Sequence, residues 1–308
     1  MKNDKGISTV LVIAVIAIVV VAAGVFYYMT LPQSLAAAQV TSGGASFPYP
    51  IVTKWISEYN KLNPQIQITY QSVGSGAGKN NLISKVFDFA GTDATLSNAE
   101  LSNYTILHIP ETAGGVVVSY TIPGVNVSGM NLTADIVSQI FQGTITKWND
   151  PAITAINPAL TLPDQDIVTV HRSDSSGTTS VFTTYLANAS SLWLLGKGTT
   201  VAWPSGLAGS GNSGVASIVR QTPYSIGYLE FFYAKNNSIP YAYIQSKSGQ
   251  FVEPTLTTIS NAAKAGVALL QQDIRTPIVN LAGDGVYPIS AFTYYIVWKD
   301  MTYMGEAK

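Results

Sequence analysis

The chain has 308 residues, of which 47% are hydrophobic and 11% charged, and it contains 26 Gly, 15 Pro and no Cys. This composition is too apolar for a disordered protein, and the length predicts one large domain or two of ordinary size. Because 16 Lys and Arg nearly cancel 17 Asp and Glu, no broad basic field exists for a nucleic-acid partner. Disulfides and thiolate sites are excluded, and His108 and His171 lack ligand spacing, so we expect no metal or other cofactor.

The first feature along the chain is an uncharged apolar run of 20 residues at positions 10–29. A helix of this length crosses a hydrocarbon core of about 30 Å. The aromatic residues 26–28 close the run and suit a membrane interface better than a signal-peptidase site. Lysines in the leader 1–9 favour a cytoplasmic leader. We therefore predict a single-pass cell-membrane anchor, a tether over residues 30–45 and an extracellular body.

Beyond the tether, helix and strand patterns alternate, which is typical of an α/β fold. Apolar residues recur at helical spacing over 51–62, and apolar and polar residues then alternate as in a strand over 66–70. A glycine turn at 74–78 precedes a helix whose apolar face is predicted over 82–87. Further strands are predicted at 114–122, 167–171, 225–233 and 292–298, and further helices at 133–141 and 255–271.

Three segments place glycine and small hydroxyl residues at the start of a helix: 43–48, 74–78 and 172–180. A helix N-terminus offers unpaired N–H groups and a positive dipole end, so it binds an anionic oxygen well. For one such segment alone, a Ser or Thr that caps its own helix is the commoner use. The repetition favours an anion site to which all three segments contribute.

Two charged residues in these patterns suggest how an anion would be recognised. Arg172 lies in a Ser/Gly turn, where its planar fork of donors suits a tetrahedral oxyanion and Asp174 can orient it; the alternative is a surface ion pair. Asp93 follows a predicted strand, and an ionised carboxylate only accepts hydrogen bonds. It would therefore tolerate hydrogen phosphate, which carries a proton, and reject sulfate. The alternative for Asp93 is an Asx turn or a helix cap.

The body resembles the phosphate-binding proteins of ABC-type phosphate transporters. The resemblance runs in family order from about residue 43 to residue 300. It is most specific at the Trp-Asn-Asp-Pro segment 148–151 and at the turn RSDSSGT, residues 172–178. The matching stretches are GGASFPYPIVTKWISEYN, YQSVGSGAGKNNLI, DFAGTDATLS, GGVVVSYTIPGV, IVSQIFQGTITKWNDPAITAINPALTLPDQDI, VTVHRSDSSGTTSVFTTYLA, WPSGLAGSGNSGVASIV and SIGYLEFFYAKNN. The segment KGIS at 5–8 also resembles the pilin-like signals of archaeal secreted binding proteins.

The resemblance implies an α/β, two-lobed periplasmic-binding-protein type II fold that holds phosphate between its lobes and delivers it to an ABC permease. The first lobe would comprise 38–115 plus 252–308, and the second 116–248. Members generally continue for several dozen residues after the strand at 292–298, so we expect exposed apolar surface on the first lobe. The implied ligand groups are Ser46, the backbone N–H of Phe47, Ser75, Asp93, Arg172, Ser176, Gly177 and Thr178, with Asp174 supporting Arg172.

Two other classes of protein compete with a binding receptor. A phosphatase or serine hydrolase would need a metal cluster, a Gly-x-Ser-x-Gly elbow or a histidine beside a nucleophilic serine, and no motif supplies one. A pilin-like surface subunit would continue the N-terminal helix past residue 30, but Pro32 interrupts it. We therefore predict a binding protein and not an enzyme.

Overall fold

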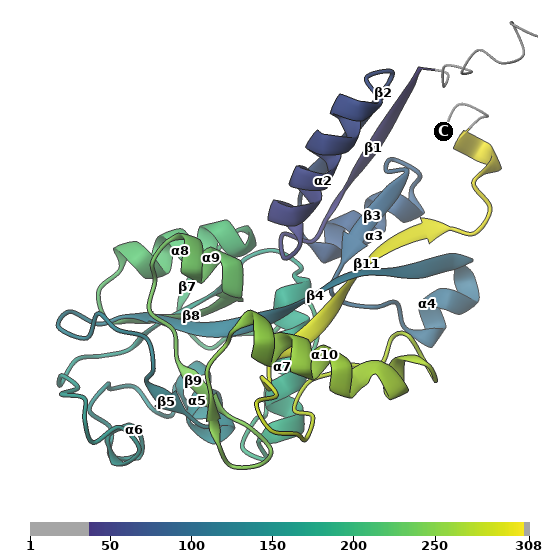
Figure 1. Ribbon diagram of the computed structural model, residues 1–308. Coiled ribbons are helices and arrows are strands. Elements are labelled where there is room, and N and C mark those ends of the chain that lie inside the picture. Colours follow the sequence, from purple (N-terminus) through teal and green to yellow (C-terminus); the bar gives the residue numbers. More distant parts are fainter. Residues whose placement is uncertain (1–36, 305–308) are drawn as a thin grey trace, which may run out of the picture. The chain divides into compact units, whose positions relative to one another are not determined.

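The computed structural model describes residues 37–304, an α/β unit built on a mixed sheet of eight strands. The strand order is β2-β1-β3-β11-β4-β8-β6-β7, and a second sheet has the order β10-β9-β5. The strands are β1 (Ala38–Gly44), β2 (Ile66–Ser72), β3 (Phe89–Thr92), β4 (Ile106–Thr121), β5 (Asn131–Leu132), β6 (Val168–Arg172), β7 (Leu207–Gly209), β8 (Ser225–Glu230), β9 (Tyr243–Gln245), β10 (Phe251–Val252) and β11 (Ser290–Trp298). Figure 1 shows this arrangement.

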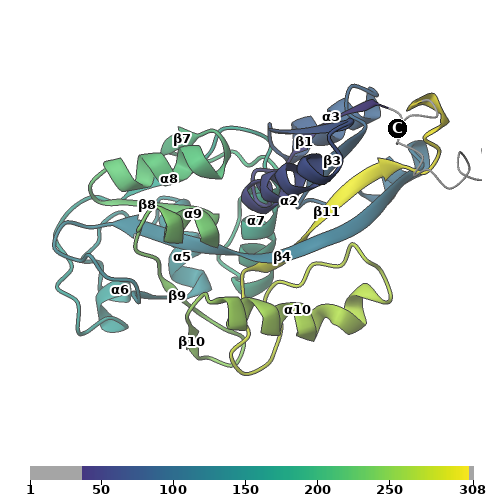
Figure 2. The ribbon, with the colours of Figure 1, turned by 45° about the horizontal axis from the view of Figure 1, so that its top comes forward.

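The helices lie between strands along the chain, and most of them pack against the large sheet (Figures 1 and 2). They are α2 (Tyr49–Leu62), α3 (Ser75–Ile83), α4 (Asn98–Asn103), α5 (Ala134–Phe141), α6 (Pro151–Ala155), α7 (Gly177–Ala189), α8 (Gly211–Gln221), α9 (Phe231–Asn236), α10 (Leu256–Leu270) and the 3-10 turn Thr302–Met304. Between residues 37 and 304 there is no helix with the length and apolar character that a membrane crossing requires. The predicted anchor at 10–29 and leader at 1–9 lie outside the described residues.

The long strand β4 joins the two halves of the large sheet. Its first part pairs antiparallel with β11 as far as Gly115, and from Val116 onward it pairs antiparallel with β8. The strands β1, β2 and β3 are parallel to one another on one side, and β6, β7 and β8 are parallel on the other. Beyond Gly115 the strand is buried on both faces, which explains its unbroken apolar run Val116, Val117 and Val118.

Most predicted elements are confirmed because their signals are local. The apolar spacing over 51–62 belongs to α2, and Thr133 caps α5 by accepting from the backbone N–H of Ile136 at 3.2 Å. Thr255 caps α10 in the same way. The α/β fold class is confirmed as well.

Four predicted boundaries were wrong, and one of them is the start of β4, which lies at Ile106 and not at residue 114. The predicted tether includes Ala38–Gly44, which forms β1 because this segment pairs with β2 on one side and with β3 on the other. The glycine turn at 74–78 is already helical from Ser75, and α3 ends before Val86, which is exposed. The strand predicted at 225–233 ends at Glu230, whose carboxylate accepts from the backbone N–H of Phe232 at 2.9 Å and starts α9.

Apolar side chains are exposed beside α2. Trp55, Tyr59 and Ile109 are each more than a third exposed. Together with Tyr295 and Val297 they line a hollow of about 500 Å³ over α2 and strands β1, β3, β4 and β11.

Candidate functional site

The predicted site residues gather where parallel strands end. Ser46 follows β1, Asp93 follows β3 and Arg172 is the last residue of β6. Ligands of open α/β sheets bind at the carboxyl ends of the strands, because loops and helix N-termini meet there. The sheet therefore brings together groups that lie far apart in the chain.

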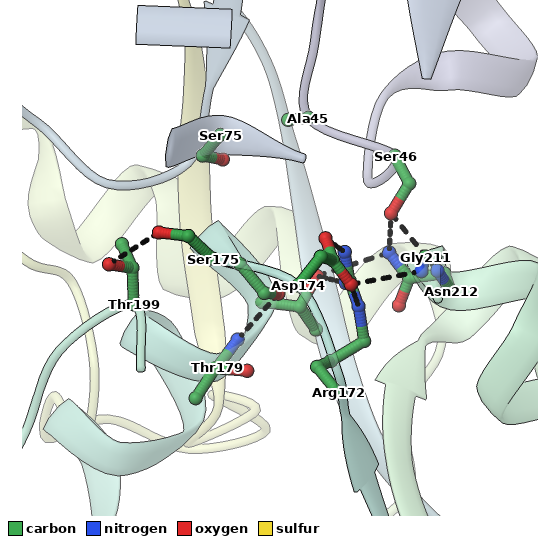
Figure 3. Close-up of polar contacts among 12 residues, drawn as sticks. Ala45, Ser46, Ser75, Arg172, Asp174, Ser175, Thr179, Thr199, Gly211 and Asn212 are labelled. Atoms are coloured by element: carbon green, nitrogen blue, oxygen red, sulfur yellow. Dashed lines mark hydrogen bonds and ion pairs between the residues drawn. The ribbon is translucent and has the colours of Figure 1, made fainter. Parts of the chain in front are cut away.

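Ser46 contacts Asn212 of α8, a helix that packs on the other half of the sheet (Figure 3). Its Oγ accepts from the backbone N–H of Asn212 at 3.0 Å and from the Asn212 side-chain amide at 2.9 Å. The same amide donates to Thr178 Oγ1 at 3.1 Å. The hydroxyl of Tyr233 donates to the carbonyl of Ser46 at 2.7 Å. Ser46 is thus fixed by direct contacts with α8 and α9.

Arg172 is held as a buried, oriented cation. Its side chain is only 1% exposed, and it forms a bidentate pair with Asp174, with Nε–Oδ1 at 2.8 Å and Nη2–Oδ2 at 2.5 Å. Nη1 donates to Thr178 Oγ1 at 3.2 Å, so three of the five guanidinium N–H groups have partners among residues 37–304. The alternative of a surface ion pair is therefore wrong, and two donors remain for an anion.

Asp174 is itself fixed from a third element. Its Oδ1 accepts from the backbone N–H of Gly211 at 3.0 Å (Figure 3). Burial would raise the pKa of Asp174, but the hydrogen bonds and charge of Arg172 and the Gly211 N–H outweigh it, so the pKa lies below its usual value. Asp174 thus stays ionised and orients the guanidinium, as predicted.

Asp93 supplies a buried acceptor. The residue is 8% exposed, and its Oδ1 has no hydrogen-bond partner within the described part of the chain. Burial raises the pKa of Asp93 to about 7, while Thr293, Arg172 and Ser75 act in the opposite direction. Its backbone N–H donates to Ser75 Oγ at 3.3 Å. An unpartnered buried oxygen of this kind needs an explanation, and a donor on a ligand would provide one.

The N-terminus of α7 lies against Asp93 and Ser75. A Cβ atom built at Gly177 would collide with Asp93 Oδ2 and Ser75 Oγ, so only glycine permits this approach. Thr178 contacts Arg172 and Asn212, as described above. The hydroxyl of Ser176 accepts from the backbone N–H of Thr179 at 3.1 Å, so this side chain caps its own helix.

Phe47 is placed differently from the polar residues. Its ring is buried and fills the space beside Gly114, so the side chain serves packing. The contribution predicted for it is its backbone N–H, in the turn that precedes α2.

Asn212 and Glu230 were not identified as site residues from the sequence. Asn212 is fully buried, and its Oδ1 accepts from the backbone N–H of Glu230 at 2.9 Å. A signal was available, because GSGNSG at 209–214 has the same glycine and serine design as the three chosen segments. Glu230 gave no signal, since burial is what raises its pKa to about 8.

The arrangement suits binding of an oxyanion. It combines a buried guanidinium, hydroxyls and a helix N-terminus, all of which donate, with one carboxylate that accepts. Across residues 37–304, no group of three His, Cys, Asp or Glu is placed to hold a metal ion.

Comparison with known proteins identifies the class of protein. Residues 31–308 match the family model of the PBP superfamily domain. The fold is shared with the phosphate-bound periplasmic protein PfluDING, at 22% identity and a TM-score of 0.64 over 86% of this chain and 82% of that one. It is also shared with a phosphate-binding protein of Stenotrophomonas maltophilia, at 22% identity and a TM-score of 0.61 over 86% and 80%.

Two curated relatives carry the same name. The phosphate-binding protein PstS of Pasteurella multocida is 38% identical over 88% of this chain and 79% of its own length. The phosphate-binding protein PstS of Methanocaldococcus jannaschii is 38% identical over 85% of this chain and 72% of its own length. The chain belongs to the PstS family of phosphate-binding proteins, as the resemblance indicated.

Proposed function

We propose that this protein is the phosphate receptor of an ABC transporter, which captures hydrogen phosphate outside the cell and delivers it to the permease. Its relatives are named as binding proteins, and the function is therefore binding and not catalysis. The observation that carries the proposal is the buried Arg172, which can only donate, beside the buried Asp93, whose Oδ1 is unpartnered. A tetrahedral anion that still carries one proton complements both groups.

Each predicted group has a role in this proposal. Arg172 donates to phosphate oxygens, and Asp174 keeps its guanidinium plane in place. Hydroxyls and backbone N–H groups surround the remaining oxygens, and Asp93 accepts the proton of the ligand. These groups are Ser46, the N–H of Phe47, Ser75, Ser176, Gly177 and Thr178.

Calorimetric titration of the full chain in detergent tests this function. We expect saturable binding of one phosphate and competition by arsenate, which has the same shape and protonation. Sulfate should bind far more weakly at the same ionic strength, because it lacks the proton that Asp93 accepts. A protein that binds neither phosphate nor arsenate would refute the proposal. Release of phosphate from a phosphomonoester would instead support the phosphatase alternative.

We also propose that the body divides into a lobe of 38–115 plus 252–308 and a lobe of 116–248. In support, β4 changes its pairing partner between Gly115 and Val116. Ser46, Ser75 and Asp93 would come from the first lobe, and Arg172 and Thr178 from the second, so phosphate would draw the lobes together. Small-angle scattering during the same titration should show a smaller radius of gyration, and identical curves at saturation would contradict closure.

We further propose that residues 10–29 anchor the protein in the cell membrane, with the body outside. The apolar run and the lysines of the leader support this orientation. The full chain should sediment with membranes and resist extraction by carbonate, and protease added to intact cells should digest the body. Recovery in the carbonate supernatant would contradict an anchor. Assembly into filaments that do not bind phosphate would favour the pilin-like alternative.

A further inference from the structure

The side-chain amide of Asn212 can adopt only one orientation. Asn212 lies in the first turn of α8 and is fully buried. Its Oδ1 accepts from the backbone N–H of Glu230 at 2.9 Å, and a backbone N–H can only donate. A flipped amide would place its NH2 group against this donor. The two protons of Nδ2 are therefore directed at the hydroxyls of Ser46 and Thr178.

Both lone pairs of the Ser46 hydroxyl are occupied (Figure 3). Ser46 Oγ accepts from the backbone N–H of Asn212 at 3.0 Å and from Asn212 Nδ2 at 2.9 Å. This backbone N–H belongs to the unpaired start of α8, where the Ser210 side chain makes no cap. A hydroxyl has two lone pairs and one proton. The Ser46 hydroxyl can therefore form a further hydrogen bond only by donating.

The Thr178 hydroxyl is also restricted to donating. Its Oγ1 accepts from Asn212 Nδ2 at 3.1 Å and from Arg172 Nη1 at 3.2 Å, and neither an amide NH2 group nor a guanidinium can accept. Ser46 is 2% exposed and Thr178 is fully buried. Among residues 37–304, neither hydroxyl proton has an acceptor. Buried polar hydrogens normally have a partner, and an anion between these hydroxyls would provide one.

A single amide thus fixes donors that come from both halves of the large sheet. Ser46 follows β1 in one half, and Thr178 lies in α7, which packs against β8 in the other. Hydroxyl groups rotate freely when nothing holds them, and ordering them costs binding free energy. Because the amide holds both hydroxyls before an anion arrives, that cost is avoided on binding.

We propose that Asn212 is a positioning residue for phosphate recognition: its amide occupies the lone pairs of the Ser46 and Thr178 hydroxyls, so that both must donate to the anion. This inference rests on the proposed function. Asn212 itself has no donor left for the ligand, because its backbone N–H and both Nδ2 protons are already used. It acts on phosphate only through the two hydroxyls.

The test is Asn212→Asp in the full chain, which keeps the shape and the acceptor for Glu230 but replaces the amide protons by lone pairs. The carboxylate would take the protons of the Ser46 and Thr178 hydroxyls, whose lone pairs would then face the anion. We expect calorimetry to show about a hundredfold loss of phosphate affinity.

Part of this loss would come from the added charge, so the substitution is repeated in a Ser46→Ala background. One of the two reversed hydroxyls is absent there, and the loss should be at least about fivefold smaller. A residue that only stabilised the fold would show no such coupling. If Asn212→Asp does not fold, Asn212→Ala removes the amide without adding charge. It should weaken binding about tenfold in wild type and less in Ser46→Ala.

The matched control is Asn157→Asp. Asn157 is also buried, and its amide bonds Asn131 and Ile153 beyond α6. This variant should unfold at a lower temperature and keep wild-type phosphate affinity.

Unchanged affinity in Asn212→Asp, or an equal loss with and without the Ser46 hydroxyl, overturns the inference. If wild type binds no phosphate, the proposed function fails separately. The inference is then tested by the same pair of substitutions in thermal unfolding without ligand, where strictly additive effects on stability would refute it.

Discussion

Replacement of Arg172 by lysine is expected to weaken phosphate binding about tenfold or more, which corresponds to roughly 1.4 kcal/mol. The guanidinium forms a bidentate pair with Asp174, contacts Thr178 and keeps two donors for the anion. An ammonium group has three donors around one point and cannot maintain this planar arrangement. Since the positive charge is retained, the loss would measure geometry and not net charge.

The matched control for this substitution is Arg275→Lys. Arg275 forms the same type of bidentate pair, with Asp273 two residues away, but its other contacts are to Leu96 and Asn98. Calorimetry should show wild-type phosphate affinity in this control, and thermal unfolding should show that both variants fold. Unchanged affinity in Arg172→Lys would remove Arg172 from the site.

Replacement of Asp93 by asparagine is expected to lower the ratio of phosphate to sulfate affinity. The amide oxygen still accepts the proton of hydrogen phosphate, so phosphate binding is largely retained. The amide also removes the charge that repels sulfate in a site where water is scarce. Wild type should bind sulfate better as pH falls below about 7, because burial raises the pKa of Asp93 to about this value and the neutral carboxyl can donate.

Titration with both anions at one ionic strength and several pH values measures this ratio. The control is Asp150→Asn, because Asp150 only caps α6, where its Oδ1 accepts from the backbone N–H of Ala152. It should change stability without changing the ratio. If Asp93→Asn behaves like this control, Asp93 serves as a turn or cap residue and takes no part in anion recognition.

The sequence alone determined those features whose causes are local. The helical spacing of apolar residues predicted α2, and Thr133 and Thr255 marked the starts of α5 and α10 because a cap bonds within its own first turn. The sequence also predicted part of the chemistry of the candidate site. A guanidinium only donates and an ionised carboxylate only accepts, wherever the fold places Arg172 and Asp93.

Only the tertiary structure decided how these groups meet. The Asn212 amide hydrogen-bonds Ser46 across 166 residues of sequence. Glu230 caps a helix inside a segment that the sequence predicted to be a single strand. The donor roles of the Ser46 and Thr178 hydroxyls are fixed only once Asn212 contacts both of them. The physical reason is that burial, strand register and contacts across the sheet arise on folding, so no local pattern encodes which carboxyls become desolvated.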